Sequence, residues 1–222
     1  MNSPTAAGNR HPDPTAITGA LSGVLFVGAL LGAMRLAKGP FPRPGTDPAA
    51  VRGYYTESAR AARSSAAGQL LSALSLAGFT ASVAKAARMH RRWPRAMPAA
   101  AVLTGGGAVG CLTAAALTHA SLTVPSQRTD QDLARTAERV FNLGGPIHGV
   151  CYGLFTAVLA ETGRDLGLLG RPSVTTGVVS AAAGLLTPTY YRWDNAGWLI
   201  PIGRFSGYTV SAILGIRLAR AT

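Results

Sequence analysis

The sequence GGPIHGVC, residues 144–151, places a helix-breaking Gly-Gly-Pro and then a histidine inside an otherwise apolar segment. A proline within a helix removes one backbone hydrogen bond, so we expect the helix to kink here. A second sequence, PIGRFSG at residues 201–207, places an arginine inside another apolar segment. These two stretches are therefore the first candidates for lining a functional site.

The composition around them is that of a membrane protein. The chain has 222 residues, of which 48% are hydrophobic and only 14% are charged. Soluble domains average about 25% charged residues. The missing charge predicts a chain that lies mostly in a lipid bilayer, and the richness in Arg, Ala and Gly is typical of actinobacteria.

The formal net charge of +12 does not indicate nucleic-acid binding. The basic residues lie between the apolar segments instead of on one face of a polar domain. Juxtamembrane arginines that face an anionic leaflet account for the same charge. The predicted partner is therefore the lipid bilayer and not nucleic acid.

Apolar segments long enough to cross a bilayer predict an all-α fold, a polytopic membrane helical bundle of six transmembrane helices. The predicted spans are 16–37, 66–84, 98–121, 130–161, 172–188 and 196–216. Residues 1–14 are polar and proline-bearing and predict a disordered tail. Residues 15–222 then form a single membrane domain, in which residues 38–55, with their four prolines, are expected to form a loop.

The orientation in the cell membrane depends on where basic residues gather. With six spans, they divide evenly between the two sides. The short loop 85–95 is densely basic, and short loops are where the positive-inside rule works best. We therefore expect both termini to lie in the cytoplasm.

Glycines spaced four residues apart predict close helix packing, because they let a neighbouring backbone approach. The pattern occurs at Gly19/Gly23, at Gly28/Gly32, and as a ridge of Gly145, Gly149 and Gly153.

Arg204 and His148 are the candidate catalytic residues. Arg204 lies about 12 Å into the sixth predicted span at 1.5 Å per residue. A charge at that depth costs at least about 2.5–3.5 kcal/mol and should face the bundle. Arg204 then either anchors an anion or carbonyl of a ligand or serves as a structural hydrogen-bond donor. A third alternative is a helix that starts later and places Arg204 at the membrane interface. His148 is either a general base or ligand donor, or a polar residue satisfied within the bundle.

Further polar residues fall on the same faces and are candidates for ligand binding. Asn142 and Asp194 are expected near the mouth of one end of the bundle. The whole candidate set is Asn142, Tyr152, Thr176, Ser180, Asp194 and Tyr208.

No cofactor or metal is predicted. The sequence contains neither a P-loop nor an H-E-x-x-H motif. Cys111 and Cys151 lie within apolar segments and have no Cys/His metal spacing, so we expect them to act as small buried hydrophobes.

The C-terminal half, residues 142–217, resembles small uncharacterised multi-pass integral membrane proteins of actinobacteria. The shared features are the LGGP sequence at 143–146 followed by His148, and PIGRF at 201–205 followed by Gly207. The resemblance implies a six-helix membrane fold and no activity.

Three functional hypotheses follow. The first is a protein whose intramembrane polar pocket binds a lipophilic small molecule, extended to a membrane-embedded enzyme, cyclase- or isomerase-like, of secondary or lipid metabolism. The second is a non-catalytic structural or regulatory protein whose glycine ridges pack against a second copy or a partner membrane subunit. The third is a transporter, which the lack of intramembrane acids disfavours.

Overall fold

The computed structural model describes residues 12–124 and 128–220, and this part of the chain is helical and contains no strand. Most of the predicted tail 1–14 lies outside the described residues. The elements are η1 (Pro14–Ile17), α1 (Thr18–Leu36), α2 (Pro48–Glu57), α3 (Ala59–Ala87), α4 (Ala96–Ser121), α5 (Asp130–Asn142), η2 (Leu143–Ile147), α6 (His148–Asp165), α7 (Arg171–Leu186), η3 (Thr187–Tyr191), η4 (Asp194–Trp198) and α8 (Leu199–Arg220).

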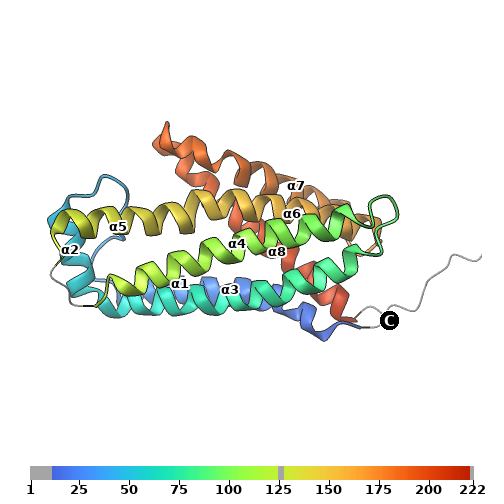
Figure 1. Cartoon of the computed structure of the whole chain (residues 1–222), viewed down its shortest axis with the longest axis horizontal. Helices are drawn as coiled ribbons and strands as arrows, with labels where there is room; N and C mark the ends of the chain where they lie inside the picture. Colours follow the sequence, from blue (N-terminus) through green and yellow to red (C-terminus); the bar gives the residue numbers. More distant parts are fainter. Residues whose placement is uncertain (1–11, 125–127, 221–222) are drawn as a thin grey trace, which may run out of the picture.

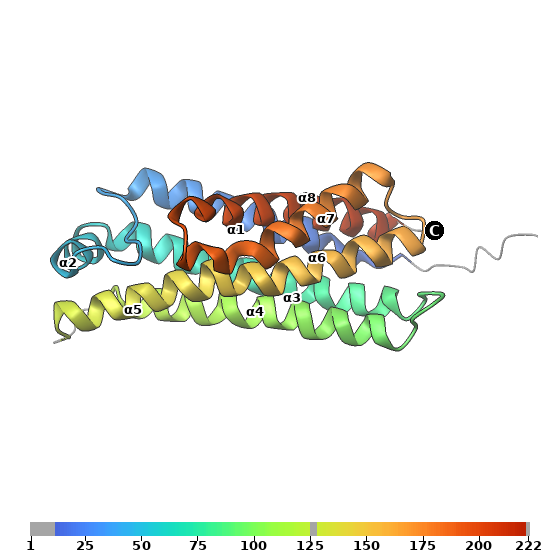
Figure 2. The same ribbon diagram turned by 90° about the horizontal axis from the view of Figure 1, so that it is seen from above.

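The helices form an elongated bundle (Figures 1 and 2). α3 packs between α1 and α4, α6 packs against α4 and α7, and α8 packs against α1, α6 and α7. The described chain begins and ends at the same end of the bundle, where the Asp13 N–H donates to the Leu218 carbonyl at 3.3 Å. α8 therefore closes the bundle beside the first helix.

Five helical stretches are long and apolar enough to cross a membrane: Pro14–Leu36, Ala59–Ala87, Ala96–Ser121, Asp130–Asp165 and Asp194–Arg220. α7 has 16 residues, about 24 Å at 1.5 Å per residue, and is shorter than these. The all-helical fold and the five apolar helices are compatible with a membrane protein.

The outer surface of the bundle is apolar as well as its interior. Leu74, Leu103 and Val24 are 70%, 74% and 68% exposed. Large apolar side chains that face outward from several helices fit contact with lipid better than contact with water. Inside, the largest fully buried side chains include Tyr152, Phe79 and Phe155.

The loop predicted for residues 38–55 is wrong over its second half, because α2 begins at Pro48. The Asp47 carboxylate accepts a hydrogen bond from the Ala50 N–H at 3.1 Å, and Pro48 occupies the first turn. This is a standard helix start, since an Asp N-cap satisfies a free N–H and proline fits the first turn.

α2 packs against α5 and forms a separate cap with its own small core, which contains Val51, Tyr55, Leu133 and Val140. The cap lies at the end opposite the described termini, and the turn between α7 and α8 stops short of it (Figures 1 and 2). The predicted fourth span, 130–161, thus begins within the polar α5 of the cap and becomes apolar only further along.

Two of the predicted glycine patterns lie at close helix contacts. A Cβ at Gly153 would lie 3.0 Å from the Cα of Gly184, so α6 and α7 touch through their backbones. A Cβ at Gly23 would lie 3.0 Å from the Cβ of Tyr208 on α8. The pair Gly28/Gly32 differs, because a Cβ at Gly28 would meet nothing within 4 Å.

Candidate functional site

The site is built on a π-helical turn. Pro146 lies within η2, the π-helix Leu143–Ile147, and α5 and α6 continue through it in one direction (Figure 1). The His148 N–H donates to the carbonyls of Leu143 and Gly145 and passes over that of Gly144. The expected kink is therefore a π-bulge without a sharp bend, a feature that often marks functional positions.

Two side chains from other elements satisfy carbonyls of this turn. Arg204 of α8 donates from Nη2 to the Gly144 carbonyl. The hydroxyl of Thr187, the first residue of η3, lies 3.0 Å from the Pro146 carbonyl oxygen and 2.7 Å from that of Gly184, and its single proton is shared between these two acceptors. The π-helical turn leaves the Gly144 carbonyl without the N–H of His148, and Arg204 supplies a donor in its place.

Arg204 also contacts His148, with 3.2 Å between Nη2 and Nδ1. Because an arginine can only donate, Nδ1 is the acceptor and the imidazole carries its proton on Nε2. That Nε2 is buried and has no hydrogen-bond partner among the described residues, and the same holds for the Arg204 Nε. Two N–H donors of one cluster are therefore left without acceptors.

The charge of Arg204 is not balanced by an acid. Its partners are a carbonyl, a neutral imidazole and the Phe26 ring, whose centroid lies 4.7 Å from the guanidinium carbon. No ion pair within residues 12–124 and 128–220 includes Arg204. A cation so placed in an apolar bundle favours the approach of a negative or strongly polar group.

Tyr152 and Tyr208 complete the cluster. Tyr152 stacks on His148 with 5.4 Å between ring centroids and an interplanar angle of 18°. Its hydroxyl is hydrogen-bonded to the Ser211 Oγ at 3.0 Å. The Tyr208 ring lies 5.4 Å from that of Tyr152 and 5.7 Å from that of Phe26. These contacts hold the His148 ring in place beside Arg204.

The two candidate ligand-binding residues on α7, Ser180 and Thr176, make different contacts. Ser180 is buried and donates to the Gly203 carbonyl at 2.6 Å, so it joins α7 to α8 next to Arg204. The Thr176 hydroxyl bonds back to the Pro172 carbonyl of its own helix at 3.0 Å. Within the described chain no hydrogen bond links Thr176 to His148 or Arg204.

Asp194 and Asn142 lie on the side of the Arg204–His148 pair that is nearer to the cap. Asp194 borders a cavity of about 350 Å³. This cavity is lined by Arg43, Phe141, Tyr190, Asp194, Gly197, Trp198, Ile200 and Pro201. Phe141 directly precedes Asn142, whose Oδ1 is buried without a partner in the described structure. Ile200 lies one helical turn before Arg204 on α8, although neither Arg204 nor His148 lines the cavity.

Sequence reasoning missed two parts of this site, Phe26 and Thr187. Phe26 lies on α1, far from Arg204 in sequence, and nothing in its neighbourhood distinguishes it from other lipophilic residues. Thr187 did carry a signal, because it follows the apolar run of α7 and precedes Pro188.

The fold and the cluster together define a class: an all-helical protein with apolar helices compatible with a membrane and a polar Arg–His cluster inside the bundle. No family model, curated protein or solved structure matches the chain. The resemblance to small actinobacterial membrane proteins thus stays a prediction, as do the roles of the site residues.

Proposed function

We propose that the protein crosses the cell membrane six times, with α7 as the fifth crossing. The same-end position of Asp13 and Leu218 supports this, because termini on one side require an even number of crossings. α7 begins just after the C-terminal end of α6. η3 then follows α7, and its residue Tyr190 lines the cavity of about 350 Å³. The dense basic loop 85–95 near the described termini supports a cytoplasmic location for that end.

We further propose that the bundle binds a lipophilic molecule with an anionic or carbonyl head group. The observation that carries this is the Arg204–His148 pair, a cation without a carboxylate and with unpartnered N–H donors on Arg204 Nε and His148 Nε2. A carboxylate or carbonyl oxygen would accept from these donors and offset the charge. The apolar part of the ligand would occupy the cavity walled by Phe141, Tyr190 and Trp198.

An enzymatic extension uses the same groups. In an acid-catalysed isomerisation or cyclisation of an isoprenoid-like or polyketide-like substrate, Arg204 would stabilise negative charge that develops on a substrate oxygen. His148 Nε2–H would donate a hydrogen bond to that oxygen. The stacked Tyr152 positions the imidazole and does not act on the substrate.

The alternative is a non-catalytic protein that packs against a copy of itself or a partner subunit. It is favoured by Gly106 and Gly110 on α4, where an added Cβ would meet nothing within 4 Å. The ridge of Gly149 and Gly153 does not support it, because those glycines already contact α7 within the chain.

The test is mass spectrometry of small molecules that co-purify with the protein in mild detergent. Arg204→Lys keeps the charge and a donor for the Gly144 carbonyl but loses the guanidinium fork. Arg220→Lys, at an exposed position on the same helix, is the matched control. We expect one lipophilic species in the wild type and in Arg220→Lys, and about tenfold less in Arg204→Lys. Equal amounts of every species in all three folded proteins would contradict the proposal.

A further inference from the structure

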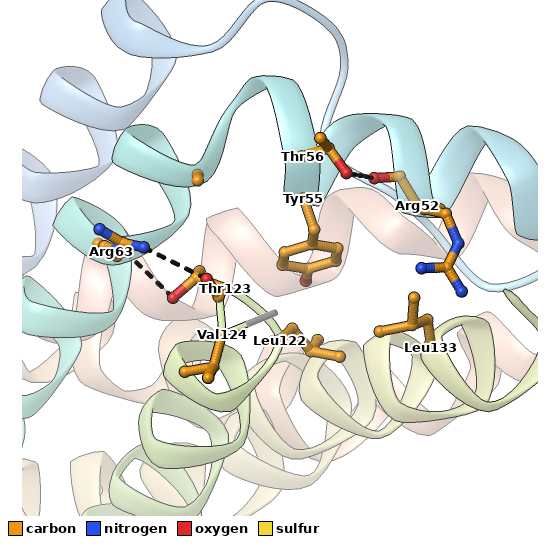
Figure 3. Close-up of a pocket in the computed structure, with 9 residues that line it drawn as sticks. Arg52, Tyr55, Thr56, Arg63, Leu122, Thr123, Val124 and Leu133 are labelled. Carbon is orange, nitrogen blue, oxygen red and sulfur yellow. Dashed lines mark hydrogen bonds between the residues drawn. The ribbon is translucent and has the colours of Figure 1, made fainter. Parts of the chain in front are cut away.

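A second cavity, of about 390 Å³, lies where the cap meets the bundle (Figure 3). α2, the start of α3, the end of α4 and α5 all contribute to its wall. It has no lining residue in common with the cavity that Asp194 borders. Ligand binding in this cavity can therefore be tested separately from ligand binding beside Arg204.

Arg63 brings a positive charge to this cavity. Its Nε and Nη2 donate to the hydroxyl and carbonyl of Thr123, both at 3.3 Å and thus long for hydrogen bonds. Throughout the described ranges no carboxylate forms an ion pair with Arg63. A guanidinium has five N–H donors, so Arg63 retains donors for an anion.

Tyr55 supplies a second hydrogen-bond donor in the wall of the same cavity. The residue is 4% exposed, and its hydroxyl is buried without a hydrogen-bond partner in the described structure. Figure 3 shows its ring between Arg63 on one side and Arg52 on the other. Burial, with a smaller contribution from Tyr54, raises the pKa of the Tyr55 phenol, so the hydroxyl stays protonated and able to donate.

Arg52 is already neutralised. It pairs with the Asp130 carboxylate and also donates to the Arg128 carbonyl at 2.5 Å. The lining residues therefore leave one uncompensated positive charge, that of Arg63. A singly charged anion with several acceptor oxygens matches this charge and the two donors.

We propose that this cavity binds a phosphate group, held by the guanidinium of Arg63 and the hydroxyl of Tyr55. The group comes from a phospholipid head group or from a soluble phosphate compound, and both present the same oxygens. The position of the cavity suits a head group, because Leu117 of α4 is 57% exposed and Val124, which lines the cavity after the end of α4, is 61% exposed. Lipid that covers these residues would place its phosphate near Arg63.

The first experiment measures lipid binding by native mass spectrometry of the intact protein. The probes are phosphatidylglycerol and a diacylglycerol with the same acyl chains, which lacks the phosphate. We expect Arg63→Gln to weaken phosphatidylglycerol binding at least about tenfold, because it removes a charged hydrogen bond. Arg60→Gln is the matched control, since Arg60 is exposed one turn earlier on α3 and does not line the cavity.

Tyr55→Phe keeps the test independent of folding. The change removes a hydroxyl that has no partner in the free protein, so the melting temperature should stay the same or rise. Phosphatidylglycerol binding should fall several-fold in the same variant. If Tyr55 had only a packing role, the melting temperature and phosphatidylglycerol binding would fall together.

The second experiment identifies the source of the phosphate. Thermal unfolding is followed in inorganic phosphate and in chloride at equal ionic strength, because a ligand of the native state raises the melting temperature. If inorganic phosphate raises the melting temperature of the wild type but not of Arg63→Gln, the ligand is a soluble phosphate compound. If phosphatidylglycerol binds but inorganic phosphate has no effect on the melting temperature, the ligand is a lipid head group. The proposal is overturned if inorganic phosphate has no effect and phosphatidylglycerol binds no better than diacylglycerol, or if Arg60→Gln and Arg63→Gln weaken binding equally.

Discussion

Gly207→Ala should destabilise the protein, because α8 has no room for a methyl group at this position. The new Cβ would lie 2.5 Å from Tyr152 Cε1, 2.8 Å from Ser180 Oγ and 3.1 Å from Thr156 Oγ1. Tyr152 cannot swing away, since its hydroxyl is hydrogen-bonded to Ser211 and its ring stacks on His148. Ser180 is likewise fixed by its bond to Gly203.

The expected cost is about 1–3 kcal/mol, the usual range for an overpacked core. Alanine also favours a helix over glycine by up to about 1 kcal/mol, which would partly mask this cost. Gly110→Ala is the matched control, because it has the same gain in helix propensity while its Cβ would meet nothing within 4 Å. The difference in the free energy of unfolding between the two variants therefore gives the cost of the steric overlap at position 207.

The assay is equilibrium unfolding in increasing mole fractions of SDS, followed by circular dichroism. The free energy of unfolding of Gly207→Ala should lie about 1–3 kcal/mol below that of Gly110→Ala. If both variants unfold at the same SDS fraction, the contact between α6, α7 and α8 is looser than described here. In that case Tyr152 would not hold the His148 ring rigidly in place.

Three further predictions follow from the same structure. Thr187→Val should lower the free energy of unfolding by about 1–3 kcal/mol, because the Pro146 and Gly184 carbonyls lose the hydroxyl that they share. Thr187→Ser keeps the hydroxyl, and equal stabilities of the Val and Ser variants would contradict this. Tyr152→Phe and Ser211→Ala should show a coupling of about 0.5–1.5 kcal/mol in a double-mutant cycle, and strict additivity would exclude their hydrogen bond. Burial raises the pKa of Tyr55, so the native protein keeps its phenol protonated after the unfolded chain ionises. Stability should therefore fall above about pH 10, and Tyr55→Phe should lose less of it in a pH series of thermal melts.

The sequence predicted the broad fold because long apolar segments leave few alternatives in a bilayer. It also predicted that Arg204 faces inward, since an outward charge at that depth is costly. The sequence predicted only that the stretches containing Arg204 and His148 line one site, and it did not predict the direct contact between the two side chains. Its cause, a carbonyl exposed by the π-bulge at Pro146, depends on the position of α8 and cannot be read from local sequence.

The cap shows why local signals were misjudged. Asp47 and Pro48 form a recognisable helix start, but Pro40, Pro42 and Pro44 just before them suggested a continuous loop. The cavity lined by Tyr55, Arg63 and Thr123 was missed for another reason, because these residues come from α2, α3 and the turn after α4. Such a site exists only once α2 has packed against α5 at the end of the bundle.

The π-helical turn at Leu143–Ile147 also sets the rotational phase between α5 and α6. One additional residue in a helix turns everything after it by about 100° about the axis, since an α-helix has 3.6 residues per turn. The wide π-turn absorbs this additional residue, so deleting one residue here would leave His148, Gly149 and Gly153 facing α7 and α8. It would remove the bulge that frees the Gly144 carbonyl for Arg204. The site therefore depends on the length of this segment as much as on its composition, and a one-codon insertion or deletion would be enough to create or abolish it.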